Sequence, residues 1–314
     1  MDIKNTLAKQ KKGAMISHIR EVLLMSKVAI VTDSSSGITQ SELKELGVFC
    51  VPMPFIIDGK EYLENVNLTQ EEFYTFLENG AEVSTSQPSI ESVKNIWDEV
   101  LKMDEYDEIV YIPLSSGLSG SCQTAYMLAM DYDDKVYVVD NHRVSVTQRQ
   151  SVIEAKQMAD SGMSAKEIKD VLLETSMDAN ILIMVNTLKY LQKGGRVTPA
   201  GAALAGLLGI KPILQIYGEK LDAYAKARSV KNAKRIMSEG IIESLKEKFP
   251  EDYESGNYEI MMAYSHDRKL AEDFREEVKD LFPGKEILIN PLPLVISCHI
   301  GPDSLAIVFV RKYM

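Results

Sequence analysis

Short runs of consecutive apolar residues alternate with longer amphipathic stretches along the first half of the chain. Residues 28–31 form such a run, and residues 109–112 and 136–139 form two more. Runs of this kind are typical of strands buried on both faces, whereas the stretches between them have helical spacing. Strands that alternate with helices predict a parallel sheet covered by helices on both faces, which we place in an N-terminal domain of residues 27–178.

Capping residues and prolines indicate where helices begin and what kind of strand is expected in this half of the chain. Thr69 precedes a glutamate-rich turn, and Ser89 follows Pro88, so each is expected to begin a helix. Two further helical stretches fall within residues 145–176. An apolar run at residues 48–57 contains two prolines, which predicts an edge strand or an irregular strand.

Beyond residue 178 the pattern changes from simple alternation to a mixture of hairpins and crossovers. Two apolar segments flank a polar turn at residues 217–220, which predicts a hairpin. Helices are expected at 230–248 and 267–281, and strands at 181–185, 258–264 and in three late apolar segments, the second of which ends near His299. This mixture predicts a C-terminal α+β domain with a mixed sheet over residues 179–314.

The first 26 residues are lysine-rich and then carry apolar residues at the spacing of a short amphipathic helix. Their apolar part is too interrupted for a signal-peptide core. Met25 lies just before the first strand, so two interpretations stay open. The extension is either an appended helix or an artefact of the assigned translation start.

Composition narrows the class of protein. The chain has 314 residues, of which 45% are hydrophobic, so it is long enough for about two domains with real cores. No apolar run reaches the roughly 20 residues that a membrane helix needs. The net charge of −11 disfavours broad binding of nucleic acid or of anionic lipid surfaces. Three scattered cysteines form no metal or disulfide pattern, which favours a cytoplasmic protein.

Three loops rich in hydroxyl side chains follow strands or precede helices, at residues 32–36, 84–89 and 115–121. Ligands in open α/β sheets bind beyond the carboxyl ends of the strands, where helix starts also present free N–H groups to anions. The plainer interpretation makes these residues helix caps and turn formers. Three such loops at one edge of a sheet favour a small anion-binding pocket.

Two common kinds of site are disfavoured. The chain has no GxxxxGK[ST] motif and no GxGxxG after its first strand, so a standard phosphate-binding nucleotide loop is absent. The sequence GLSGS at 117–121 lacks the glycine spacing of a nucleophile elbow. No nucleophile is paired with His142, His266 or His299, which disfavours a serine hydrolase.

The second half of the chain adds three features to the candidate site, namely a glycine pair, a cation and a run of small residues. Gly194 and Gly195 let backbone come close, and Arg196 supplies a fixed positive charge, unless the pair only ends a helix. Residues 199–210 are small and aliphatic and predict a helix that lines an apolar tunnel or packs in the core. His299 is either a ligand-binding group or a structural hydrogen-bonding residue.

Five motifs in this order resemble the DegV family of bacterial fatty-acid-binding proteins. They are VTDSS at 31–35, TSQPS at 85–89, SSGLSGS at 115–121, LQKGGR at 191–196 and HIGP at 299–302. The resemblance implies two α/β domains with one long-chain fatty acid between them. It also implies a protein without catalytic residues or cofactor of its own, which in some members presents the lipid to a fatty acid kinase subunit.

The resemblance assigns roles to individual residues. The fatty-acid carboxylate is expected near Thr85, Ser119, Ser116, Arg196 and His299. Residues expected beside the pocket are Ser34, Ser86, Gln87, Gly117, Leu118 and Gly195, and those expected to dock the kinase are Lys226 and Arg228. Asp303 and residues 141–145 depart from the family pattern, and the second departure is expected to alter the lining of the site.

Two other functions remain open from the sequence. One is an enzyme that acts on a small anionic substrate at the hydroxyl-rich pocket, which a short, wet pocket would favour. The other is a regulatory binding module for a different lipid, which would lack a kinase partner. A buried hydrocarbon tunnel favours the fatty-acid carrier, because about 0.8 kcal/mol per buried methylene makes the tail the main source of affinity.

Overall fold

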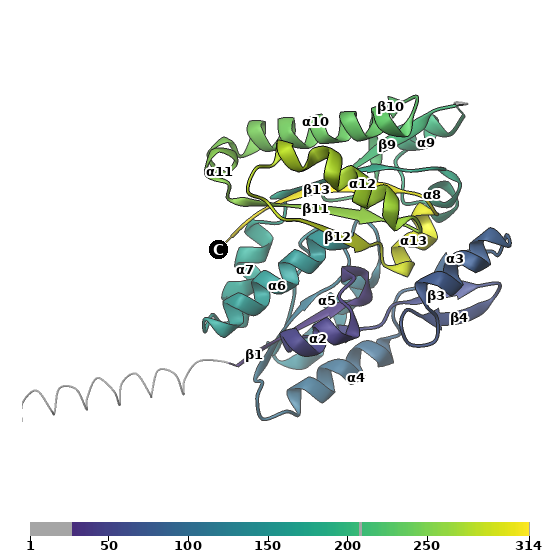
Figure 1. Ribbon diagram of the computed structural model, residues 1–314. Helices are drawn as coiled ribbons and strands as arrows, with labels where there is room; N and C mark the ends of the chain where they lie inside the picture. Colours follow the sequence, from purple (N-terminus) through teal and green to yellow (C-terminus); the bar gives the residue numbers. More distant parts are fainter. Residues whose placement is uncertain (1–26, 207–208, 314) are drawn as a thin grey trace, which may run out of the picture.

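A computed structural model describes residues 27–206 and 209–313 of the chain. The amphipathic helix expected within residues 1–26 lies outside the described residues. Figure 1 shows an upper part built on the C-terminal sheet, a lower part built on the N-terminal sheet, and a small module beside them that carries β3, β4 and α3. The mixed α/β fold with a parallel and a mixed sheet is confirmed.

The N-terminal sheet has four parallel strands in the order β2-β1-β6-β7. Their bounds are β1 Val28–Asp33, β2 Phe49–Val51, β6 Glu108–Ile112 and β7 Val136–Val138. Side chains of β1 alternate between two cores, with Val28 and Ile30 in one and Ala29 and Val31 in the other. Helices cover each face of the sheet. The face with Val28 and Ile30 packs against α2 (Gln40–Leu46), α6 (Val146–Asp160) and α7 (Ala165–Glu174). The opposite face packs against α4 (Ile90–Leu101) and α5 (Ser121–Ala129).

The apolar run at residues 48–57 is two strands in two sheets, not one irregular strand. Proline lacks the N–H that would extend the parallel ladder, so β2 ends before Pro52, and the backbone N–H of Met53 instead donates to Ser34 Oγ (2.9 Å). The chain then enters a three-stranded antiparallel sheet in the order β4-β3-β5. With its helix it forms what we call the small module, made of β3 (Pro54–Ile57), β4 (Lys60–Leu63), α3 (Gln70–Glu78) and β5 (Val83–Thr85).

The C-terminal sheet has six strands in the order β10-β9-β8-β13-β11-β12. Its strands are β8 (Ala179–Met184), β9 (Lys211–Ile216), β10 (Asp222–Ala227), β11 (Tyr258–Tyr264), β12 (Ile287–Pro291) and β13 (Leu305–Arg311). Only the β11–β12 pair is parallel among these strands, and the predicted β9–β10 hairpin is present. Two helices, α10 (Val230–Lys248) and α12 (Arg268–Val278), cover one face, and α11 (Pro250–Ser255) follows α10. The boundary near residue 178 stays a prediction, although β8 begins at Ala179.

Two predictions for this half were wrong. The apolar segment before His299 is a helix, α13 (Leu294–Ile300), and not a strand. It follows Pro293 and ends at Gly301, whose φ of 79° suits glycine. The small-residue run is not one helix either, because α9 (Pro199–Ala202) gives way to a tighter 3-10 turn at residues 203–206.

The second face of the C-terminal sheet packs against the other two parts of the molecule. Ile181 and Ile183 of β8 point to this side, whereas Leu182 and Met184 point toward α10. The same apolar cluster includes Phe55 and Phe73 of the small module, Leu114 and Val144 of the N-terminal domain, and most of α13. This shared core is where all three parts meet.

Candidate functional site

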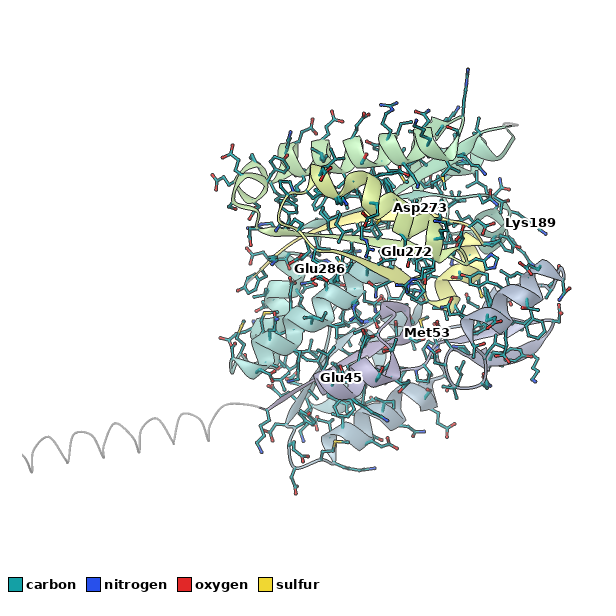
Figure 2. The ribbon with its side chains drawn as sticks, in the orientation of Figure 1. Glu45, Met53, Lys189, Glu272, Asp273 and Glu286 are labelled. Atoms are coloured by element: carbon teal, nitrogen blue, oxygen red, sulfur yellow. The ribbon has the colours of Figure 1, made fainter. Side chains whose placement is uncertain are left out.

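A cavity of about 320 Å³ opens within this shared core. Residues of the N-terminal domain, the small module and the C-terminal domain all line it. Figure 2 labels one of these residues, Met53, between the upper and lower parts of the molecule. The lining residues are Met53, Thr85, Ser86, Gln87, Leu114, Leu118, Ser119, Gly120, Val144, Leu191, Arg196, Ile216, Leu221, Val295, Ile296, His299 and Ile300.

Polar lining residues from three parts of the fold meet at this cavity. Thr85 at the end of β5 contacts His299 of α13, with 2.8 Å between Thr85 Oγ1 and His299 Nε2. Arg196 follows α8 (Lys189–Gly194). Ser119 comes from the loop before α5, so the N-terminal domain also supplies a hydroxyl. These side chains form the polar end of the cavity.

His299 is held as a neutral imidazole. Burial, and to a smaller extent the nearby positive charge of Arg196, lowers the pKa of His299 to about 4. Gly194 makes room for the ring, because a Cβ at this position would lie 2.1 Å from His299 Nδ1. A neutral ring leaves Arg196 as the fixed positive charge at the polar end.

Arg196 is anchored by carbonyl groups alone. Its Nε donates to Leu118 O (3.1 Å), and its Nη1 donates to Gly194 O. Among the ion pairs of the described residues, none includes Arg196. A partly buried guanidinium prefers a carboxylate or phosphate partner, so this geometry leaves it available to an anion inside the cavity.

The loop before α5 presents further donors. Ser119 Oγ accepts from the backbone N–H of Ser121 (3.2 Å), so its own hydroxyl proton is left for another partner. The buried hydroxyl of Ser121 has no hydrogen-bond partner in the described structure. Gly120, which lines the cavity, precedes the helix without a side-chain cap.

The rest of the lining is aliphatic. Helix α13 gives one face to the cavity through Val295, Ile296, His299 and Ile300, which recur at helical spacing. Seven further apolar side chains from the other elements complete the walls: Met53, Leu114, Leu118, Val144, Leu191, Ile216 and Leu221. The cavity therefore suits a ligand with one anionic end and a hydrocarbon body.

The small module fixes the start of α13. Glu64, just after β4, accepts the backbone N–H of Leu294 (2.7 Å) and the side-chain amide of Gln70 (2.7 Å). Burial raises the pKa of Glu64 to about 7, although both hydrogen bonds act in the opposite direction. Tyr74 of α3 donates from its hydroxyl to Ser297 in the middle of α13 (3.0 Å).

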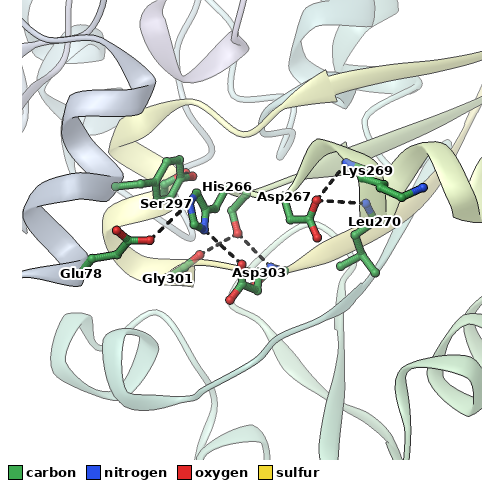
Figure 3. Close-up of polar contacts among 11 residues, drawn as sticks. Glu78, His266, Asp267, Lys269, Leu270, Ser297, Gly301 and Asp303 are labelled. Carbon is green, nitrogen blue, oxygen red and sulfur yellow. Dashed lines mark hydrogen bonds and ion pairs between the residues drawn. The ribbon is translucent and has the colours of Figure 1, made fainter.

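A second polar cluster lies beside this junction (Figure 3). His266 contacts Asp303 through Nδ1 (3.2 Å), and its Nε2 lies 3.7 Å from a carboxylate oxygen of Glu78 on α3. The ring of Tyr74 stacks on His266, with 4.8 Å between centroids. Asp303, a departure from the family pattern, thus faces His266. The contacts of His266 with Glu78 and Tyr74 help join the small module to the C-terminal domain.

The sequence-predicted residues separate into two groups. Those that line the cavity are Thr85, Ser86, Gln87, Leu118, Ser119, Arg196 and His299. Ser34, Ser116, Gly117 and Gly195 do not line it. Ser116 is exposed, and Gly117 lies against the β9–β10 turn, where a Cβ would come within 2.7 Å of Glu219 Cα. Lys226 and Arg228 are exposed at the end of the edge strand β10.

Sequence reasoning missed most of the apolar walls. Met53, Ile216 and Val295 lie in apolar runs that look like ordinary core, so nothing in their spacing marks a cavity. The run at 199–210 was expected either to line the tunnel or to pack in the core. None of its described residues lines the cavity, and Leu204 is buried in the shared core. Val144, within the departure at residues 141–145, does line the cavity.

Within residues 27–206 and 209–313, no group of three or more His, Cys, Asp or Glu side chains is placed to hold a metal ion. No helix in that part of the chain has both the length and the apolar character needed to cross a membrane.

Fold and site together define an α/β protein with a parallel and a mixed sheet, and with a largely apolar cavity between its parts that has a cationic, hydroxyl-rich end. The model of the DegV family, described as uncharacterised proteins, matches residues 27–312, so the chain belongs to the DegV family. A DegV domain-containing protein of Streptococcus pneumoniae is 31% identical over 287 residues, which cover 90% of this chain and 99% of that protein.

Two solved structures of the family are closely similar. A DegV family protein from Thermus thermophilus, described by its fatty acid binding, has a TM-score of 0.80 at 29% identity and covers 91% of this chain and 100% of its own. DegV of Bacillus subtilis, described as a fatty acid binding protein, has a TM-score of 0.79 at 26% identity with the same coverage.

The carboxyl group of Glu64 gives the junction a pH dependence. Since its pKa rises from 4.5 to about 7 on folding, the folded state binds this proton more tightly than the unfolded state. The stability that this group contributes is full below the unfolded value and is lost as pH rises through about 7. We therefore expect Glu64→Gln to gain stability relative to wild type as pH rises, as measured by urea unfolding between about pH 5 and about pH 8.

The matched control is Glu71→Gln, which changes an exposed carboxyl on α3 of the same module. Its stability should follow the wild-type pH profile. A constant stability difference between Glu64→Gln and wild type across this range would contradict the burial assigned to Glu64.

Proposed function

We propose that this protein binds one long-chain fatty acid in the cavity, with its carboxylate at the polar end. The observation that carries the proposal is the unpaired Arg196 at the end of an apolar cavity, beside the hydroxyls of Thr85 and Ser119. The fatty acid binding described for the two related solved structures supports it.

The energetics favour such a ligand. Each methylene group that leaves water contributes roughly 0.8 kcal/mol, so about ten of them outweigh the polar contacts. Each hydrogen bond to the charged carboxylate adds about 1.5–3 kcal/mol and fixes the direction of the chain. The tail therefore supplies the affinity, and Thr85, Ser119 and Arg196 orient the head.

An enzyme acting on a small anionic substrate is the less favoured candidate. His299 is hydrogen-bonded to Thr85, but no carboxylate of residues 27–206 or 209–313 is hydrogen-bonded to its ring as in a nucleophile–base–acid arrangement. The aliphatic walls also provide more apolar surface than a small polar substrate could contact. We propose a carrier that holds its ligand without chemistry or cofactor of its own.

The carrier role includes presenting the carboxylate to a fatty acid kinase in the cytoplasm. Lys226 and Arg228 support this part, because both are exposed near β10 and neither makes an ion pair among the described residues. Exposed cations on an otherwise acidic protein attract an acidic partner and speed its association.

Lipid extraction tests the proposal directly. The protein purified from a bacterial host should release one fatty acid in near-equal molar amount when denatured, as measured by mass spectrometry of the extract. Lipid-free protein that also fails to bind added oleate would contradict fatty-acid binding.

The polar end predicts which side chains hold the head. Thr85→Ala combined with Ser119→Ala should weaken oleate binding by at least about a hundredfold, since two hydrogen bonds to a charged group are lost. Ser116→Ala is the matched control, because this exposed serine lies in the same loop but outside the lining. Equal affinities for all three proteins, measured by competition with a fluorescent fatty acid, would place the carboxylate elsewhere.

Kinase docking has its own test. Lys226→Glu combined with Arg228→Glu should lower the rate of acyl phosphate formation by about tenfold at low salt, while oleate affinity stays unchanged. Lys102→Glu removes an exposed cation at the end of α4 and should leave the rate as in wild type. A rate that the double variant does not lower would argue against docking at β10.

A further inference from the structure

The small module is inserted in the N-terminal domain but makes its polar contacts elsewhere. Residues 54–85 lie between β2 and α4 in the chain. The hydrogen bonds and ion pairs that these residues make with the rest of the described chain all reach the C-terminal domain. The module is therefore tied to one domain by the backbone and held to the other by side chains.

The two connections of the module lie side by side. Strand β3 pairs with β5, so that Phe55 stands opposite Thr85, and the backbone N–H of Ser86 donates to Pro54 O (3.2 Å). The chain thus enters and leaves the module at one edge, and these two connections can serve as a single hinge. Phe55 also packs edge-on against Phe73, with 5.8 Å between centroids, so β3 and α3 are held together as one body.

The free side of the module covers the polar end of the cavity. Thr85 lines the cavity and contacts His299 of α13. The other hydrogen bonds to α13 lie outside the lining, from Tyr74 to Ser297 and from the backbone N–H of Leu294 to Glu64. Contacts that hold the module closed are therefore distinct from those that would touch a ligand.

The interface between α3 and the C-terminal domain is not closely packed. A depression of about 340 Å³ separates α3 from Tyr264, His266 and Pro291. Across it, His266 and Glu78 are 3.7 Å apart, as Figure 3 shows. Movement of the module on this side breaks polar contacts and separates little apolar surface.

We propose that the small module is a lid that turns about its two connections to admit and release the fatty acid, and that Glu64 is its latch. The inference rests on the proposed function, since it concerns how the same ligand enters and leaves. Closed, the module brings Thr85 to the polar end. Open, it removes Thr85 from His299 and exposes that end of the cavity to solvent.

The surroundings of Glu64 make the latch sensitive to pH. The titratable groups that face it are Cys50 of β2, Tyr74 of α3 and Cys298 of α13, and burial raises the pKa of each, so all three stay neutral. No cation of the described residues offsets the charge of an ionised Glu64. Burial raises the pKa of this carboxyl from 4.5 to about 7 when the lid is closed.

The sign of the effect follows from this difference. In the open lid the carboxyl is in water and its pKa returns toward 4.5, so the closed lid binds the proton more tightly. Closure is strongest at low pH and weakens as pH rises through about 7. The dissociation rate constant of oleate should therefore rise by about tenfold between about pH 6 and about pH 8.

Glu64→Gln keeps the two hydrogen bonds and removes the titration, so its dissociation rate constant should stay constant over this range. The matched control Glu71→Gln should keep the wild-type rise. His266→Gln should keep it as well, which separates Glu64 from the other titratable contact of the interface. The measurement is stopped-flow displacement of a fluorescent fatty acid by excess oleate.

Tyr74→Phe tests the lid without a change of pH. Its lost hydrogen bond to Ser297 lies outside the cavity and holds the lid with or without ligand. Association and dissociation rate constants should both rise by about fivefold, while Kd stays within about twofold. Tyr62→Phe, in β4 of the same module, is the matched control and should leave both rates unchanged.

The outcomes separate this inference from the proposed function. Wild-type protein that binds oleate, with wild-type rates in Tyr74→Phe and an unaltered pH dependence in Glu64→Gln, would place the entry route elsewhere and overturn the inference alone. A weaker Kd in Tyr74→Phe with an unchanged association rate would also overturn it, since the module would then act only on the bound state. Wild-type protein that does not bind oleate would overturn the proposed function.

Discussion

A positive charge without an anionic partner is the constraint around which the site is built. Arg196 is partly buried, and within the described part of the chain its side chain donates hydrogen bonds to the carbonyls of Leu118 and Gly194 and forms no ion pair. A buried charge is costly unless it is paired, so an anion in the cavity gains more here than it would at an open surface. The same charge and burial keep His299 neutral, which prevents a second cation at the polar end.

The polar end exists only when three parts of the chain are docked. Thr85 belongs to the small module, Ser119 to the N-terminal domain, and Arg196 and His299 to the C-terminal domain. The contacts that hold them together are local and specific, such as Glu64 on the start of α13 and Tyr74 on Ser297. A loss of docking would therefore disperse the head group residues before any part unfolded.

Much of the fold follows from apolar spacing, and the exceptions have physical causes. The strand Tyr258–Tyr264 and the helix Val230–Lys248 have the bounds that their patterns predict. Helix α13 was mistaken for a strand, because a short and mostly apolar segment of seven residues does not distinguish a buried helix from a buried strand. The break at Pro52 was missed because the apolar run continues across it, although the chain changes sheets there.

The site was predictable to different degrees at its two ends. Hydroxyls and a cation stand out in a sequence because such residues are unusual next to apolar strands, and Thr85, Ser119, Arg196 and His299 do line the cavity. The apolar walls carry no such mark, since Ile216 and Val295 are indistinguishable from core residues until strands and α13 are placed.

A crystal structure of the purified protein with a bound long-chain fatty acid tests the central claim most directly. We expect the carboxylate within hydrogen-bond distance of Thr85 Oγ1 and Ser119 Oγ and close to Arg196, with the chain running along α13 into the shared core. A fatty acid on the outer surface, with the cavity filled by side chains or by water alone, would contradict the claim.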